Sequence, residues 1–345
     1  MVRKHLTVIA VPLFGLLAGL LVVELGFRLI EGRLEKKVWS DRPTFYFAPE
    51  KSHTLQDYPY NAKKAPNTFR IAVIGDSFAF APHMQFTDAF PKKIEQMLNL
   101  NDTSKRAEVI NFGVSAASTA HEVPLVRQAI KEEADLIIMQ ITLNDPEIKH
   151  RMPVGVTDTS RFAPYEPQGA AAWVMRRLHI VKFIVKRIHN SQSRRDYIEY
   201  FKSLYENPKS WMSFKNAWRQ ISAEGRKSNT RIVAVIFPLF GLPFDEHYPL
   251  SAVHEKILKL LKALGIEALD ISEIYERIPL EHLQVLPNID RHPNEIAHRM
   301  AAERIYSWLV EIGALPSEFQ IKKRFKQRTR IIFEEPCDPL KPDCS

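Results

Sequence analysis

The chain has 345 residues, with 48 Lys and Arg against 40 Asp and Glu, giving a formal net charge of +8. This length fits one α/β domain with additions. The basic residues are dispersed except near 176–195 and 322–330, and no zinc-finger or helix-turn-helix pattern accompanies them. We therefore expect no nucleic-acid partner, and a nearby anionic membrane surface accounts for the charge.

The first 30 residues contain an apolar segment. Residues 6–27 are apolar apart from Glu24, and about 20 such residues suffice to cross a bilayer as a helix. No convincing small-x-small cleavage site follows, so residues 1–30 predict an uncleaved transmembrane anchor. Basic residues lie on both sides of the segment, so they do not fix its orientation. Residues 31–68 carry no strong period and are interpreted as a linker.

Strand and helix patterns then alternate along a domain expected over 69–316. Short apolar runs rich in β-branched residues predict buried parallel strands, and the amphipathic segments between them predict helices. Alternation of this kind is typical of an α/β fold with a five-stranded, doubly wound parallel sheet. The expected strands are 70–74, 107–112, 135–142, 231–237 and 266–271, and the expected helices are 88–99, 120–132, 251–264 and 295–312.

An insertion of about 147–230 separates the third and fourth strands, far longer than a crossover needs. Apolar residues between 174 and 188 follow helical spacing, with basic residues on the other sides. Such a helix either packs on its own domain or lies on a membrane. Trp211, Phe214 and Trp218 also share a helical face, which predicts the core of a lid in preference to a substrate platform.

Four polar groups fall where strands meet loops or where a loop meets the last helix. Ser77 follows Gly75 and Asp76 at the end of the first strand, and Gly113 ends the second. Asn144 follows the third strand, and His292 precedes the last helix. The carboxyl ends of parallel strands share one edge of a sheet, so we expect these groups to gather there. A serine beside an imidazole that titrates near neutral pH can act as a nucleophile.

Serine, glycine, asparagine and histidine in this order resemble the SGNH (GDSL-type) hydrolase family, over roughly 68–145 and 231–312. The resemblance implies a flavodoxin-like strand order 2-1-3-4-5 with Ser77 as nucleophile and His292 as general base. It also implies that Asp290 assists His292, and that Ser77, Gly113 and Asn144 form the oxyanion hole. No metal or cofactor is implied.

The chain departs from the family pattern at two places. Thr142 replaces the glycine of Gly-x-Asn-Asp, which leaves Asn144 intact. Asp290 stands two residues before His292, where the family has three. The shorter spacing predicts a badly aimed Asp290, with a backbone carbonyl or another carboxylate orienting the imidazole. His298 is expected to be a packed or surface residue.

Residues 317–345 form a basic tail that ends with the only two cysteines, Cys337 and Cys344. A disulfide between them suits an oxidising compartment, and two reduced thiols are the alternative. With the anchor, this predicts a single-pass inner-membrane protein whose domain is periplasmic or extracytoplasmic.

The expected function is hydrolysis of acyl esters, including O-acetyl esters, on a cell-envelope glycan or lipid. An acyltransferase that uses the same site is one alternative, because a sugar hydroxyl or water can resolve the same acyl-enzyme. A non-catalytic envelope scaffold with this fold is another, and the Asp290 spacing is the only feature that favours it.

Overall fold

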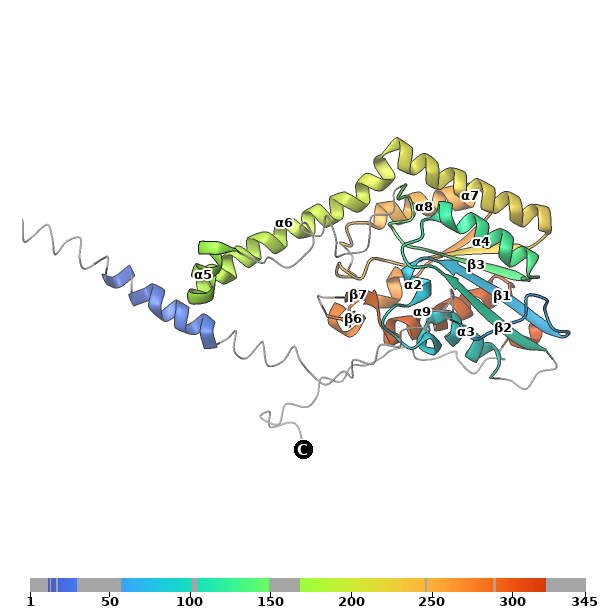
Figure 1. Ribbon diagram of the computed structural model, residues 1–345, viewed down its shortest axis with the longest axis horizontal. Coiled ribbons are helices and arrows are strands. Elements are labelled where there is room, and N and C mark those ends of the chain that lie inside the picture. Colours follow the sequence, from blue (N-terminus) through green and yellow to red (C-terminus); the bar gives the residue numbers. More distant parts are fainter. Residues whose placement is uncertain are drawn as a thin grey trace, which may run out of the picture.

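The structure of the chain is a computed structural model (Figure 1). It describes residues 12, 14–16, 18–29, 57–100, 105–148, 168–245, 247–287 and 290–320. Cys337, Cys344, most of the expected linker and part of the expected anchor lie outside the described residues. In the part that is described, no helix is both long enough and apolar enough to cross a membrane.

Five parallel strands form the central sheet in the order β2-β1-β3-β4-β5, which confirms the expected fold class and strand order. Most side chains in the three central strands are completely buried, because helices cover both faces and the strands are almost continuous apolar runs. The strands are β1 (Thr68–Gly75), β2 (Arg106–Gly113), β3 (Leu136–Ile141), β4 (Arg231–Ile236) and β5 (Glu267–Asp270).

Two helix pairs cover the sheet on opposite sides (Figure 1). Helix α3 (Phe90–Leu98) packs against α9 (Glu295–Glu311), and α4 (Thr119–Lys131) packs against α7 (Pro208–Ser228). Helix α8 (Ser251–Ala263) leads into β5. Short 3-10 turns occupy Phe86–Asp88, Ser272–Tyr275, Leu280–His282 and Ser317–Phe319.

Helix α7 is the crossover helix that returns the chain to β4. Phe214 and Trp218 are completely buried, and the Trp211 ring stacks on Phe214 with centroids 5.5 Å apart. The expectation of a lid at this face was wrong: α7 contacts α4 and β4, and its aromatic residues belong to the main core. Before α7 come α5 (Gly169–Arg177) and the long α6 (His179–Glu206).

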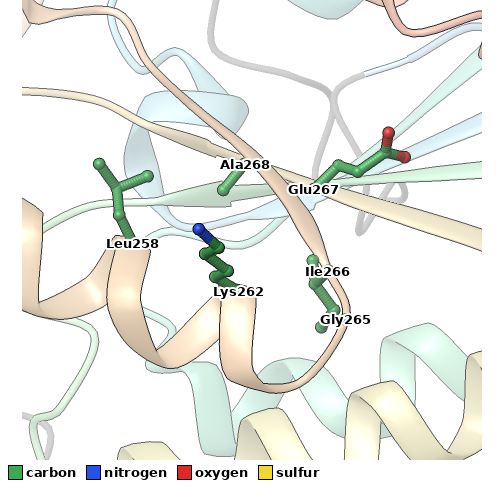
Figure 2. Close-up of a pocket in the computed structure, with 6 residues that line it drawn as sticks. All are labelled: Leu258, Lys262, Gly265, Ile266, Glu267 and Ala268. Atoms are coloured by element: carbon green, nitrogen blue, oxygen red, sulfur yellow. The ribbon is translucent and has the colours of Figure 1, made fainter.

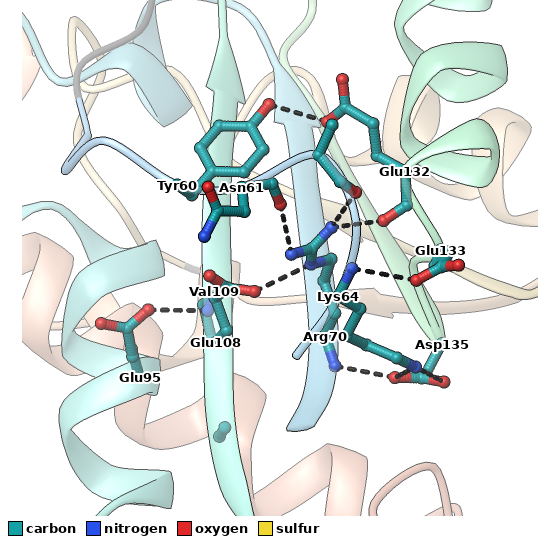
Figure 3. Close-up of polar contacts among 12 residues, drawn as sticks. Tyr60, Asn61, Lys64, Arg70, Glu95, Glu108, Val109, Glu132, Glu133 and Asp135 are labelled. Atoms are coloured by element: carbon teal, nitrogen blue, oxygen red, sulfur yellow. Dashed lines mark hydrogen bonds and ion pairs between the residues drawn. The ribbon is translucent and has the colours of Figure 1, made fainter. Parts of the chain in front are cut away.

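Buried Arg70 ties the amino-terminal edge of the sheet together (Figure 3). Its Nε donates to Glu108 Oε2 at 2.8 Å, and its own backbone N–H donates to Asp135 Oδ2 at 2.7 Å. The guanidinium also donates to the backbone oxygens of Asn61, Ala62 and Glu132. A guanidinium with several acceptors can be buried at tolerable cost, so Arg70 fixes the segment before β1 to the end of α4.

A pocket of about 420 Å³ lies beside the α8–β5 turn, lined by residues that include Lys262, Gly265 and Glu267 (Figure 2). Since a parallel strand begins at the amino-terminal edge of its sheet, this pocket lies at the edge opposite to the ends of β1, β2 and β3. It is therefore separate from the place where the polar groups of the expected site gather.

Candidate active site

The predicted nucleophile is the first residue of a one-turn helix. Strand β1 ends at Gly75, and α2 (Ser77–Phe80) starts at once. Asp76 caps this helix, because its Oδ1 accepts the N–H of Phe78 at 2.9 Å. The N–H of Ser77 has no acceptor among the described residues and is available at the helix N-terminus.

Two polar side chains from β3 and its end hold this turn in place. Gln140 Oε1 accepts the N–H groups of Asp76 and Ala79, at 3.1 and 3.2 Å. Gln140 Nε2 donates to Thr142 Oγ1 at 2.5 Å, and that hydroxyl donates to Asp76 Oδ1 at 3.2 Å. A Cβ on Gly75 would lie 2.3 Å from Gln140 Oε1, so glycine is needed there for close approach. Gln140 was not among the predicted site residues, although a polar residue inside an apolar strand is a usable signal.

His292 and Asp290 lie on a short antiparallel hairpin that was not expected. Strand β7 (Asp290–Pro293) pairs with β6 (Gln284–Leu286) at the carboxyl-terminal edge of the main sheet. His292 Nε2 is 3.0 Å from Ser77 Oγ, and His292 Nδ1 is 2.6 Å from Asp290 Oδ1. The expectation that Asp290 would be badly aimed was wrong. Side chains two apart on a strand share a face, so the shorter spacing suits a strand.

The surroundings of Asp290 favour its ionised form. Burial alone would raise its pKa, but the hydrogen bond and the charge of His292 outweigh burial, so the pKa of Asp290 lies below its usual value. The backbone N–H of His292, donated to Asp290 Oδ1 at 3.0 Å, acts in the same direction. His83 Nε2 lies 3.8 Å from Asp290 Oδ2 and adds a smaller contribution. The His292 side chain is 32% exposed, which leaves it accessible to a substrate.

Gly113 and Asn144 lie at the same edge, but both already interact with other groups. The N–H of Gly113 donates to Asn111 Oδ1 at 2.9 Å. A Cβ on Gly113 would lie 2.3 Å from Phe80 N, so the approach of α2 explains this glycine by itself. The Asn144 carboxamide interacts with Asp76, and its Oδ1 is buried without a partner among the described residues. Their part in an oxyanion hole stays a prediction.

Three buried carboxyl groups lie behind the nucleophile turn. Burial raises the pKa of Asp76, and burial together with neighbouring carboxylates raises the pKa of Glu122 and Asp145. Asp145 Oδ2 accepts from Thr119 Oγ1 at 2.9 Å, whereas both oxygens of Glu122 lack a hydrogen-bond partner in the described chain. This cluster therefore favours protonated carboxyl groups.

His298 is a packed residue. Its Nδ1 accepts the N–H of Phe90 at 3.1 Å, and its ring stacks on that of Phe90. Burial, with the nearby His292, lowers the pKa of His298 to about 3. It is therefore neutral at physiological pH and joins α9 to α3.

Together the site residues form a Ser-His-Asp relay at the end of a parallel sheet. Ser77 Oγ is within reach to pass its proton to His292 Nε2, and Asp290 Oδ1 is placed where it can hold the proton on Nδ1 and stabilise an imidazolium. The free N–H of Ser77 can donate to an oxygen that becomes negative beside the serine. These are the elements that acyl transfer requires.

Comparison with known proteins gives structural likeness only. No family model and no curated protein matches the chain. It is 12% identical to a protein assigned to the lipolytic G-D-S-L family from Desulfitobacterium hafniense, covering 69% of this chain and 98% of that one with a TM-score of 0.41. It is 13% identical to a catalytic mutant of an acetylxylan esterase from Geobacillus stearothermophilus (71% and 94% covered, TM-score 0.44). A two-domain esterase active on acetylated mannans is 11% identical (72% and 50% covered, TM-score 0.44).

These values describe similarity to esterase structures at low identity. The contacts among Ser77, His292 and Asp290 are observed independently of these similarities.

Proposed function

We propose that the chain is a serine esterase that cleaves acyl esters through Ser77, His292 and Asp290. The observation that carries this proposal is the continuous contact from Ser77 Oγ to His292 Nε2 at 3.0 Å and from His292 Nδ1 to Asp290 Oδ1 at 2.6 Å. A general base must lie within hydrogen-bond reach of the proton it removes, and His292 does.

The reaction takes two steps. Ser77 Oγ attacks the ester carbonyl carbon while its proton passes to His292 Nε2, and the carbonyl oxygen becomes an oxyanion. When that intermediate collapses, the imidazolium gives its proton to the departing alcohol, which leaves an acyl group on Ser77. Water then loses a proton to His292 and attacks the acyl carbon. When this second intermediate collapses, the bond from the acyl carbon to Ser77 Oγ breaks, the imidazolium returns its proton to Oγ, and the carboxylic acid leaves.

We further propose that the substrates are acyl esters, including O-acetyl esters, of a cell-envelope glycan or lipid. The chain would be held in the inner membrane by residues 6–27, with its domain outside the cytoplasm. The apolar N-terminal run and the confinement of both cysteines to the tail support this location. Membrane fractions resistant to carbonate extraction, and a C-terminal reporter active only outside the cytoplasm, are the expected results. Full-length protein in the soluble fraction would contradict the anchor.

A fluorophosphonate probe tests the chemistry, because it labels only an activated serine. We expect labelling of the native protein and of the control Ser307→Ala, which changes an exposed serine of α9. Ser77→Ala and His292→Ala should not be labelled and should not hydrolyse a small activated ester. A folded His292→Ala protein with near-normal turnover would refute the proposal.

A further inference from the structure

The first half of α6 and all of α5 project from the α/β domain (Figure 1). We call residues 169–195 the α5–α6 arm. It contains no Asp or Glu, but it has seven Lys or Arg residues, namely Arg176, Arg177, Lys182, Lys186, Arg187, Arg194 and Arg195. Several large apolar side chains of the arm are also exposed, namely Trp173, Leu178, Phe183, Ile184 and Ile188. Basic and apolar side chains without acidic ones are typical of helices that lie in a lipid interface.

An N-terminal helix contacts this arm where α5 ends and α6 begins. The structure describes that helix from residue 12 to residue 29 except at residues 13 and 17. Glu24 accepts the first two N–H groups of α6, from His179 at 2.8 Å and from Ile180 at 2.9 Å. Arg28 donates to the Arg177 backbone oxygen at 2.7 Å. A carboxylate at a helix N-terminus and a cation at a helix C-terminus are both favourable, so this contact is specific.

The contact also fixes where the arm would lie. Glu24 and Arg28 are at the carboxyl-terminal end of the apolar run of residues 6–27, and the Phe27 ring lies 4.7 Å from that of Phe183. This step rests on the membrane anchor proposed above: a segment held at the end of a membrane-spanning run is held at the level of the headgroups. Lipid is therefore the occupant that both the charge and the position of the arm favour.

We propose that the α5–α6 arm lies on an anionic lipid surface, with its exposed apolar side chains among the acyl chains and its basic side chains at the phosphates. Helix α6 then continues into the domain, where the Tyr197 ring lies 5.6 Å from the Arg291 guanidinium. Arg291 stands between Asp290 and His292, so one continuous helix joins the lipid-bound arm to the triad and fixes the orientation of the site. Lipid binding by the arm does not require Ser77 to be a nucleophile.

The test uses the full chain, reconstituted in vesicles of phosphatidylcholine with or without an equal part of phosphatidylglycerol. Hydrogen exchange of residues 169–195 is compared with exchange in detergent, and quenching of Trp173 by brominated lipid is taken as the difference between native protein and Trp173→Phe. We expect slower exchange and quenching in vesicles with phosphatidylglycerol. Both should also occur in the Ser77→Ala protein, which separates this result from the esterase proposal.

Two variants decide the outcome. Ile184→Glu/Ile188→Glu should lose both signals, while the matched control Leu100→Glu/Met212→Glu, at exposed apolar sites outside the arm, should keep them. Lys182→Gln/Lys186→Gln/Arg187→Gln should abolish the difference between the two kinds of vesicle. Exchange in the arm that is equally fast in vesicles and detergent, or protection that survives Ile184→Glu/Ile188→Glu, would overturn the proposal and favour a protein partner for this surface.

Discussion

Asp290→Asn is the sharpest test of the relay, because the substitution keeps the shape of the side chain and removes its charge. In the native site Asp290 Oδ1 accepts from both His292 Nδ1 and the His292 backbone N–H. An amide can present its NH₂ group to Nδ1, which moves the imidazole proton to Nε2, facing Ser77. The imidazole can then no longer accept the serine proton.

The expected loss is close to the loss that the Ser-His-Asp template suffers when only its aspartate is changed. Removing the aspartate charge in the Ser-His-Asp template lowers kcat by about 10⁴-fold through the wrong tautomer. His292 Nδ1 and Asp290 Oδ1 are in direct hydrogen-bond contact at 2.6 Å. We therefore expect a fall in kcat of about 10³- to 10⁴-fold here, equivalent to about 4 to 5.5 kcal/mol in the barrier.

The assay is kcat for a small activated ester, with folding checked by circular dichroism and thermal unfolding. Asp88→Asn is a matched control, because Asp88 lies outside the site and pairs with Lys93. In a Ser77→Ala background Asp290→Asn should add almost nothing, since residues of one relay are not additive. A folded Asp290→Asn enzyme that retains more than about a tenth of native kcat would show that Asp290 does not orient His292.

Three further results are expected. Ser77→Ala and His292→Ala should each lower kcat by about 10⁶-fold, with the double variant no worse; strictly multiplicative losses would show that they do not act together. Because the pKa of Glu122 is raised, the folded state holds a proton on this carboxyl group at pH values where the unfolded state has released it. The stability that protonated Glu122 contributes is therefore lost as the pH rises above the pKa that Glu122 has in the unfolded chain. In urea unfolding, the free energy of unfolding of Glu122→Gln should therefore increase relative to that of the native protein as the pH rises above 4.5, the ordinary pKa of Glu. A difference that does not change with pH would contradict this reasoning. Arg70→Met should lower the free energy of unfolding by about 3–5 kcal/mol, because it removes the buried partner of several acceptors. Arg127→Met, at an exposed ion pair, should lower it by no more than about 1 kcal/mol. Equal losses in the two variants would contradict the role given to Arg70.

Most of the sheet could be predicted from the sequence because its strands are buried on both faces. A run such as residues 70–74 is apolar throughout, and the observed β1 differs from the expected strand only at its ends. The expected bounds of α4 and α8 were also within one residue. The strand order was predicted from the family resemblance, because the periodicity of a single strand carries no information on which strands lie beside it.

The sequence was less informative where function depends on long-range contacts. The pairing of β6 with β7 places Asp290 and His292 on one face, but residues 284–293 carry too few alternating apolar positions to predict a hairpin. The Trp211 face was assigned to a lid because helical spacing shows that a face is buried and does not show against what. The contact between Glu24 and the start of α6 joins residues that are 155 positions apart in the sequence, so no local sequence pattern predicts it.

Thr142 shows how a departure from a family pattern can be integrated into a site. A glycine at this position would offer no hydroxyl, so Gln140 Nε2 and Asp76 Oδ1 would each lose a buried partner. Thr142 joins them, and Gln140 in turn holds the N–H groups of Asp76 and Ala79 on either side of Ser77. A buried donor or acceptor left unpaired costs about 1–3 kcal/mol, so the threonine and the glutamine stabilise each other. The position of the Ser77 hydroxyl thus depends on a polar pair in the neighbouring strand β3 as well as on the turn that carries it.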